Sequence, residues 1–365
     1  MNAVYVHIPF CKHICSYCDF PKVLHINSFV DEYLDALQNE ILNTYDGEII
    51  KTLYVGGGTP SCLTKKERVK LFRILENFNK SPDCEYTFEC NPGDIDDSFL
   101  DDIVDGGVNR LSIGVQSFDK DNLKFLDREI EYDDLENKLT LIRNRGIDNI
   151  NLDLMYALPN EKLNTLKKDV SLLLKLKPAH ISTYSLIIEK HTKVNNDKTE
   201  YIDEDLDRKM YDYICNKLAK SGYVHYEVSN FALPGCESKH NLNYWNNDEY
   251  YGFGLGAAGF KAGVRYSNTK NIDEYIKCNY RSEELLLSLK DQTDNELMLG
   301  LRKLAGVDVN VYYDKYGTNI QDDYPIKQMM EEGYLIYKSG YVFINPKYIY
   351  TMNEILIHLI WLKMI

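Results

Sequence analysis

The sequence predicts an α/β protein: a parallel βα part-barrel followed by a small, mostly helical module at the C-terminus. Short β-rich runs recur along the first half of the chain, each followed by a helical stretch, at a spacing of about 25–50 residues that is typical of βα units. This rhythm stops near residue 190. Strands that alternate with helices form parallel sheets. Six consecutive units favour a barrel or part-barrel, with a doubly wound open sheet as the alternative.

The expected strands of this part are the β-rich runs 3–8, 52–57, 85–90, 110–116, 149–156 and 180–188. Amphipathic patterns at 28–45 and 63–78 predict two of the intervening helices, because apolar residues recur there at helical spacing. After a polar, loop-like segment at 191–205, we expect a helix at 203–221 and a strand at 223–232.

The chain from about residue 281 onward has the pattern of a compact module. Its helical patterns, short turn and final helix together predict a winged-helix-like unit, with helices at 294–306 and 326–338 and the turn at 338–346. We therefore expect three parts: the part-barrel over 1–190, an extension of the barrel over 191–280, and the C-terminal helical module over 281–365.

Composition narrows the possible partners and location. The chain has 42 Lys and Arg against 56 Asp and Glu, a net charge of -14, and an acidic surface repels phosphate backbones. We therefore expect no nucleic acid partner. No charged-then-apolar leader opens the chain, and no apolar run reaches the ~18 residues of a membrane span. A cytoplasmic protein is expected, with the apolar run 355–362 as a packed helix. Peripheral membrane contact and the oligomeric state stay open.

Three of the nine cysteines stand close together, at Cys11, Cys15 and Cys18, on a loop after the first strand. The other six are scattered and are expected to be mostly small buried hydrophobes. Thiols at this density indicate a metal site. One possibility is zinc, with His7 or His13 as the fourth ligand. The other is a 4Fe–4S cluster, which normally takes four cysteines, so that three would leave one iron open to an outside ligand.

Polar and glycine-rich groups stand at the ends of the following strands, where βα barrels gather their sites. The second strand ends in "GGGTP" (56–60), the third at Glu89 and the fourth at Gln116, while the fifth carries Asp153. A tight turn would also explain the glycines. A buried carboxylate at Asp153 needs a partner, and a ribose hydroxyl would serve. Arg128, by default a surface residue, could pair with a carboxylate.

The spacing Cys-x3-Cys-x2-Cys, with Tyr17 before the third cysteine, resembles the signature of the radical S-adenosylmethionine (SAM) enzymes. In that superfamily the open iron binds the amino and carboxylate groups of SAM. Over nearly its full length the chain also resembles the oxygen-independent coproporphyrinogen III oxidase family, and within it the HemW branch of heme chaperones. The resembling stretches include "VYVHIPFCKHICSYCDF", "LYVGGGTPS", "FECNPG", "NRLSIGVQSF", "DLMYALP" and "HNLNYW".

The resemblance implies a (β/α)6 partial barrel with a small C-terminal helical module. It assigns the 4Fe–4S cluster to the three clustered cysteines. It also implies which residues lie around bound SAM, namely Tyr5, Tyr17, Gly57, Gly58, Thr59, Glu89, Gln116, Arg128 and Asp153.

Two features favour the chaperone branch over the decarboxylases. Phe20 stands where the decarboxylases carry an additional cysteine, and their long N-terminal segment does not precede the motif here. The chain also has the His-Asn-x2-Tyr-Trp motif of the HemW branch at 240–245. The resemblance thus implies heme binding and transfer to an unidentified acceptor protein, with His240 as a candidate iron ligand and Cys236 or His191 as rivals. His191 itself stands where a glycine would be expected.

Two other functions remain as alternatives. The first is oxidative decarboxylation of coproporphyrinogen III, in which a SAM-derived radical abstracts hydrogen from the substrate. The second is a zinc-stabilised barrel of unrelated function. Phe20 and "HNLNYW" argue against the first, and iron and sulfide content would separate the cluster from zinc.

Overall fold

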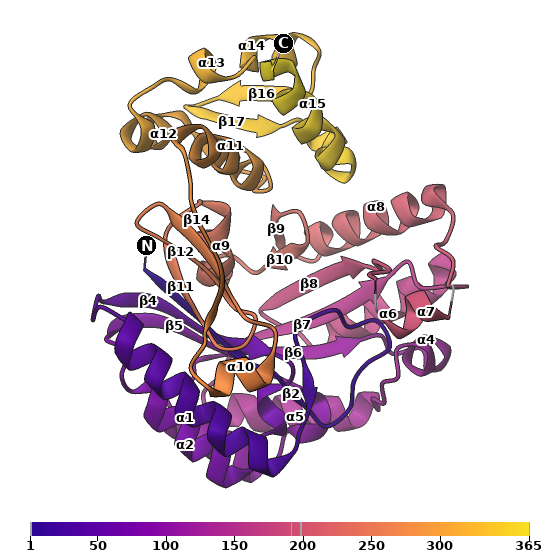
Figure 1. Ribbon diagram of the computed structural model, residues 1–365. Coiled ribbons are helices and arrows are strands. Elements are labelled where there is room, and N and C mark those ends of the chain that lie inside the picture. Colours follow the sequence, from indigo (N-terminus) through magenta and orange to yellow (C-terminus); the bar gives the residue numbers. More distant parts are fainter. Residues whose placement is uncertain (1, 191, 198, 365) are drawn as a thin grey trace.

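The computed structural model describes residues 2–190, 192–197 and 199–364. Within them, the central strands of the largest sheet run parallel in the order β1-β4-β5-β6-β7-β8. Each is followed by at least one helix, so the predicted (β/α)6 part-barrel is confirmed (Figure 1). The strands are β1 (Ala3–Ile8), β4 (Ile50–Gly57), β5 (Lys80–Cys90), β6 (Arg110–Gln116), β7 (Asn149–Tyr156) and β8 (His180–Ser185).

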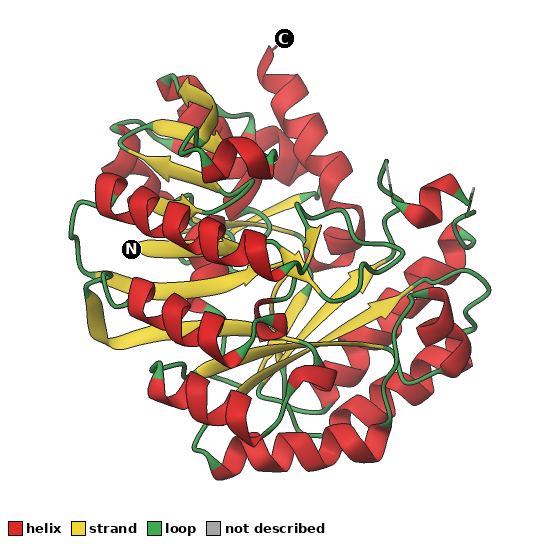
Figure 2. Cartoon of the chain, turned by 60° about the horizontal axis from the view of Figure 1, so that its bottom comes forward, coloured by secondary structure: helices red, strands yellow, loops and turns green. Residues whose placement is uncertain are grey.

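The helices of these six units lie on the outer side of the sheet, as the red helices of Figure 2 show. The predicted helices at 28–45 and 63–78 are present. The second begins after Thr64, whose hydroxyl accepts from the Glu67 amide while the Glu67 carboxylate accepts from the Thr64 amide. This reciprocal cap fixes the start of the helix. The helices are α1 (Asn27–Thr44), α2 (Lys65–Leu75), α3 (Asp97–Asp105), α4 (Lys120–Phe125), α5 (Tyr132–Asn144), α6 (Leu163–Lys175), α7 (Lys193–Asn196) and α8 (Glu204–Lys220).

The same sheet continues beyond the barrel strands at both edges. On one side β11 (Tyr250–Phe253) pairs in parallel with β1, and antiparallel strands follow it: β12 (Ala258–Lys261), β13 (Val264–Asn268) and β14 (Arg281–Leu286). Gly252 allows the close approach of β11 and β12, because a Cβ at this position would lie 1.8 Å from the Ala258 carbonyl oxygen. On the other side, the single strand expected at 223–232 is two strands, β9 (Val224–Glu227) and β10 (Asn230–Ala232), which pair antiparallel.

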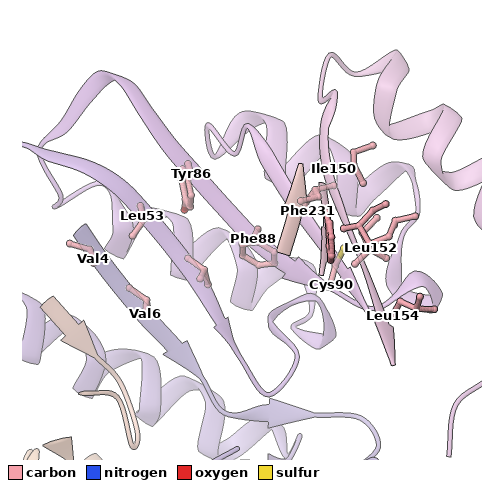
Figure 3. Packing of buried hydrophobic residues seen from close by; sticks show 14 of the residues in the cluster. Val4, Val6, Leu53, Tyr86, Phe88, Cys90, Ile150, Leu152, Leu154 and Phe231 are labelled. Atoms are coloured by element: carbon pink, nitrogen blue, oxygen red, sulfur yellow. The ribbon is translucent and has the colours of Figure 1, made fainter. Parts of the chain in front are cut away.

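Side chains alternate between two faces of the barrel strands, and both faces are buried. The outward residues form an apolar core under the helices, with Val4, Val6, Leu53, Phe88, Ile150, Leu152 and Leu154 among the side chains of Figure 3. The inward residues are largely polar, for example Thr52, Glu85, Thr87, Arg110 and Asn151, and each is less than 9% exposed. Burying polar groups costs free energy unless they are paired. A polar barrel interior is therefore the first structural sign of a functional site.

The C-terminal module contains helices around a three-stranded sheet in the order β15-β17-β16. The helix predicted at 294–306 begins earlier, at Leu289, and ends at Gly300. The helix predicted at 326–338 is wrong in its second half, because residues 335–338 form a strand. Gly333 has φ +81°, a left-handed conformation that ends the helix. The elements are α11 (Leu289–Gly300), β15 (Val307–Asp308), α12 (Val309–Tyr316), α13 (Ile320–Asp323), α14 (Ile326–Glu331), β16 (Leu335–Lys338), β17 (Tyr341–Ile344) and α15 (Met352–Met364).

The division into three parts stays a prediction, and one element bears on its second boundary. Strand β14 falls inside the range expected for the C-terminal module, yet it pairs with β13 in the large sheet. The elements of the module proper therefore begin at α11. Helix α15 holds the apolar run 355–362 as expected, with Leu356 and Leu359 buried. Among the described residues, no helix combines the length and the apolar character that crossing a membrane requires.

Candidate functional site

The cysteine loop follows β1 at the carboxyl end of the barrel strands. Its first residues form β2 (Phe10–Cys11), which pairs with β3 (Val23–Leu24). Two hydrogen bonds connect the loop to the barrel: the Ser16 hydroxyl donates to the Phe125 carbonyl at 2.8 Å, and His7 Nε2 lies 2.7 Å from the Pro21 carbonyl. Within the loop, Lys22 Nζ donates to the Cys18 carbonyl at 2.5 Å. The loop is thus fixed to the barrel on both of its flanks.

The three thiols of this loop are close enough for the charges of Cys15 and Cys18 to act on Cys11. Burial, together with the neighbouring Cys18 and Cys15, raises the pKa of Cys11 to about 11. Burial also raises the pKa of Cys18, while the Lys22 ammonium acts in the opposite direction. Three neighbouring thiols in a loop that has no fourth cysteine fit a cluster with one open iron. Among residues 2–190, 192–197 and 199–364, no three His, Cys, Asp or Glu side chains are grouped as they would be around a single metal ion.

His7, one candidate for a fourth zinc ligand, is fully engaged. Its Nε2 must donate to the Pro21 carbonyl, which only accepts, so its Nδ1 accepts from the Tyr5 hydroxyl at 2.9 Å. Burial lowers the pKa of His7 to about 4, so the ring is neutral at physiological pH. With both nitrogens occupied, His7 is a brace between β1 and the cysteine loop. The sequence suggested His7 only as a possible zinc ligand and gave no sign of this role.

The glycine loop after β4 lies directly against the cysteine loop. The amides of Gly58 and Thr59 donate to the carbonyls of Ile8 and Phe10, and the Thr59 hydroxyl lies 3.5 Å from Cys11 Sγ. Gly58 has no room for a side chain, because a Cβ there would lie 2.7 Å from the Pro9 carbonyl carbon and oxygen. The glycines therefore form a tight turn that also approaches the predicted cluster position.

Two partly buried carboxyl groups lie beneath this loop. Glu89 accepts hydrogen bonds from the Tyr54 hydroxyl at 2.7 Å and the Gly57 amide at 3.0 Å. Burial raises the pKa of Glu89 to about 7, against those two hydrogen bonds. Asp153 accepts from Asn151 Nδ2 at 2.7 Å, and burial raises its pKa to about 6. The charge of Arg110 acts on both groups and that of Arg128 on Asp153, but within the described residues neither carboxyl is in ion-pair contact, so both suit a cationic or hydroxyl-bearing ligand.

Arg128 reaches the same place from the segment after α4. Its Nη1 donates to Asn91 Oδ1 at 2.7 Å and lies 3.7 Å from Cys15 Sγ, and its Nη2 donates to the Gly114 carbonyl. Asn91 is a site residue that we missed, although it stands inside the "FECNPG" stretch. Arg128 is thus partly buried and ties the ends of β5 and β6 to the cysteine loop, while its expected contact with SAM stays a prediction.

Gln116 and Tyr17 complete this rim. Gln116 is buried and has φ +72°, where β6 bulges against β7, an unusual backbone state for a residue other than glycine. The pKa of Tyr17 is raised well above its ordinary value by burial. Its hydroxyl is close enough to Arg128, Cys15 and Asp153 for their charges to act on it. Tyr17 thus lies between the cysteine loop and the strand ends.

Most of the predicted site residues therefore meet at the carboxyl end of the barrel, and two lie elsewhere. Tyr5 is deeper inside, with its ring 6.0 Å from that of Tyr54. His240 is at the amino end of the strands, where its Nδ1 lies 2.8 Å from the Thr52 hydroxyl. Of the rival heme ligands, Cys236 lies in the loop after β10, and His191 is outside the described residues. The residues that meet are Cys11, Cys15, Cys18, Tyr17, Gly57, Gly58, Thr59, Glu89, Gln116, Arg128 and Asp153.

A parallel (β/α)6 sheet with three thiols at its carboxyl end matches the architecture of radical SAM proteins. The model of the radical SAM superfamily matches residues 5–173 of this chain. The fold and the site thus define a radical SAM protein, and this class implies a 4Fe–4S cluster and SAM as cofactors.

Similar proteins identify the branch. The heme chaperone HemW of Lactococcus lactis subsp. lactis (strain IL1403) is 43% identical over 335 residues, which cover 88% of this chain and 87% of the relative. The heme chaperone HemW of Bacillus subtilis (strain 168) is 36% identical, with 97% and 98% covered. The chain therefore belongs to the HemW heme chaperone family.

A solved structure shows the same fold over nearly the whole chain. It is the radical SAM coproporphyrinogen III oxidase HemN of Escherichia coli, with a TM-score of 0.85, covering 98% of this chain and 89% of the other. The two sequences are 22% identical, so this likeness concerns the fold.

Proposed function

We propose that this protein binds heme and passes it to an acceptor protein, and that it carries a 4Fe–4S cluster on Cys11, Cys15 and Cys18 with SAM on the open iron. The observation that carries the proposal is the match to HemW heme chaperones over 88–97% of this chain. Phe20 supports the chaperone function, because it stands where the decarboxylases carry their extra cysteine. Its side chain is 64% exposed at the edge of the loop.

The residues around the thiols suit the two ends of SAM. Ionised Glu89 would accept from the methionine ammonium beside the glycine loop, and Arg128 would pair with the methionine carboxylate. Asp153 would accept from a ribose hydroxyl. When reduced, the cluster supplies the electron by which radical SAM enzymes cleave SAM. The protein's own part is to orient SAM and to keep the carboxyl groups buried until SAM arrives.

The cluster is tested by anaerobic reconstitution. Wild-type protein should contain iron and labile sulfide, and SAM should change the spectrum of the reduced cluster. Cys15→Ala should lose the cluster because one iron loses its thiolate. Cys84→Ala is the matched control, since Cys84 is also buried but lies at the amino end of the barrel. Stoichiometric zinc without labile sulfide would contradict the proposal.

The chaperone function is tested by supplying heme and coproporphyrinogen III separately to the reconstituted protein. We expect stable heme binding and no conversion of coproporphyrinogen III, even with reductant and SAM. Transfer is then measured as the change from the spectrum of this protein's heme complex to that of the acceptor when an apo-heme protein is added. Multiple-turnover decarboxylation would instead establish the oxidase function, which shares this fold.

A further inference from the structure

The "HNLNYW" motif forms a short helix, α9 (Lys239–Trp245), that closes the amino end of the barrel. The backbone amides of Lys239 and His240 each donate to the Glu85 carboxylate at 3.1 Å. The Ser238 hydroxyl accepts from the Asn241 amide and so caps the helix start. The motif is thereby attached to the inward face of β5, on the side of the barrel away from the thiols.

The imidazole of His240 is sealed inside this junction. It is 1% exposed, with Nδ1 at 2.8 Å from the Thr52 hydroxyl and Nε2 at 2.8 Å from the Tyr244 hydroxyl. Burial, aided by the charge of Arg110, lowers the pKa of His240 to about 3, so the ring is neutral. Binding of heme iron by His240 would require the ring to leave one of these partners and reach solvent.

The ring of His240 also supports a residue of the SAM site. It packs against Tyr54 with ring centroids 5.1 Å apart and planes 32° from parallel. The Tyr54 hydroxyl donates to Glu89 Oε1, while Glu89 Oε2 accepts from the Gly57 amide. Successive contacts therefore connect the motif at one end of the barrel to the glycine loop at the other.

We propose that His240 is a positioning residue for the SAM site: its ring holds Tyr54 so that the Tyr54 hydroxyl stays on Glu89 and Glu89 stays on the glycine loop. The positioning role rests on the proposed function only in placing SAM beside Glu89. This positioning role gives the "HNLNYW" motif a function that does not require His240 to bind iron. Because heme binding is measured separately from SAM binding, the chaperone function and the positioning role of His240 can be refuted independently.

The pH dependence of SAM binding reports on the hydrogen bond between Tyr54 and Glu89. Loss of the Tyr54 hydrogen bond removes a stabiliser of the Glu89 carboxylate, so the pKa of Glu89 should rise above about 7. SAM binding, which needs the ionised carboxylate, should then require higher pH. The titratable and charged groups that act on Glu89 from the surrounding strands and helix are Tyr5, Tyr54, Cys90, Arg110, Asp153, Tyr184 and Tyr244.

The test is a double-mutant cycle on full-length, cluster-loaded protein, with His240→Ala, Tyr54→Phe and the combined variant. Each is measured for iron and sulfide content, for SAM affinity between pH 6 and 9, and for heme affinity and Soret spectrum. His225→Ala is the control, because that half-buried ring stacks on Phe231 at the far edge of the sheet. Tyr244→Phe is the milder variant, since it frees Nε2 but keeps both rings.

We expect Tyr54→Phe and His240→Ala each to weaken SAM binding about tenfold or more at pH 7, the loss expected for one hydrogen bond to a charged group. The combined variant should be little weaker than either, because residues in one chain of contacts are not additive. Cluster content and heme affinity should stay at the wild-type level. If His240→Ala does not fold, Tyr244→Phe should shift the pH profile in the same direction.

Three results would overturn the positioning role. One is a SAM affinity and pH profile of His240→Ala that equal those of wild type. If His240→Ala does not fold, the same result for Tyr244→Phe counts. Another is fully additive effects of the two substitutions. The third is a lost Soret band with normal SAM binding, which would make His240 the iron ligand. A wild-type protein that binds SAM but no heme would refute the proposed function and leave the positioning role standing.

Discussion

At the scale of single residues, the barrel interior holds ionisable groups for which the part of the chain that the structure describes provides no ion pair within contact distance. Glu89 and Asp153 are partly buried carboxyls with raised pKa values, on which the charge of Arg110 acts, and the buried Arg110 guanidinium makes a long hydrogen bond, 3.4 Å to the Thr87 hydroxyl. Such groups are costly in a folded protein unless something compensates them. A ligand that carries an ammonium, a carboxylate and hydroxyl groups would compensate them, and SAM has all three.

Glu89 should make SAM binding depend on pH. The methionine ammonium needs the ionised carboxylate, so affinity should fall about tenfold for each pH unit below about 7. Glu89→Gln should bind SAM weakly at every pH. Titration of SAM into the reduced, reconstituted protein measures the pH dependence of the wild-type affinity and the affinity of Glu89→Gln. A wild-type affinity that is constant from pH 6 to 8.5 would show that Glu89 does not meet the ammonium.

The same substitution should not destabilise the protein without SAM. A carboxyl with a raised pKa favours the folded state while protonated, and this contribution is lost as pH rises from 4.5 to about 7. Glutamine stays neutral, and its carbonyl oxygen can still accept from the Gly57 amide while its NH2 group donates to the Tyr54 hydroxyl, which also accepts. At pH 8, Glu89→Gln should therefore unfold at a temperature equal to or above that of wild type. A clearly lower unfolding temperature would mean that the ionised carboxylate stabilises the fold.

At the scale of elements, the strand ends and loops of the barrel carry the site, and α9 closes its other end. Helix α9 has no amphipathic repeat to indicate it, because it is only seven residues long and the side chain that it buries against the barrel strands, that of His240, is polar. The glycine loop is specified more strongly. Its backbone amides bind the ends of β1 and the first residues of the cysteine loop, so its shape determines where the thiols lie.

Gly58→Ala tests this coupling. The added methyl would meet the Pro9 carbonyl at 2.7 Å, and we expect a loss of about 1–3 kcal/mol in the free energy of unfolding. Cluster content should fall as well, because the two loops move apart. Gly93→Ala is the control, since nothing lies within 4 Å of a Cβ at that exposed position. Urea unfolding and iron analysis measure the two effects. Equal behaviour of the two variants would contradict the role of the glycine loop.

At the scale of the whole molecule, the larger of two apolar clusters among the described residues joins all three predicted parts. One cluster of buried side chains includes Val6 of the barrel, Phe253 of the extension, and Leu297 and Ile344 of the C-terminal module. Figure 1 shows the module as a separate layer above the sheet, yet α11 contacts α9, and Lys315 Nζ donates to the Asn246 carbonyl at 2.6 Å.

We therefore expect the described parts to unfold together. Urea titration followed by far-ultraviolet circular dichroism and by tryptophan fluorescence should give coincident transitions, because a shared core couples the parts. The two tryptophans, at 245 and 361, report on α9 and on the C-terminal end. Two separated transitions would instead support independent modules with a boundary near residue 281.

The sequence by itself determined the features that depend on local pattern. Alternating hydrophobic runs, helical periodicity and turn residues specified the six βα units, and motif spacing pointed to the cysteine loop, the glycine loop and the branch of the family. Parallel strands share one carboxyl end, so even the meeting of Glu89, Gln116 and Asp153 could be anticipated from the order of the strands.

Only the tertiary structure decided what depends on distant segments. The pairing of β11 with β1 joins residues some 250 positions apart in the chain, and no local pattern encodes such a partner. His240 is the clearest case. In the sequence it is a histidine beside two aromatic residues, which suits a heme ligand. In the fold, Thr52 and Tyr244 occupy its two nitrogens and Tyr54 covers its ring, because α9 is carried to the closed end of the barrel.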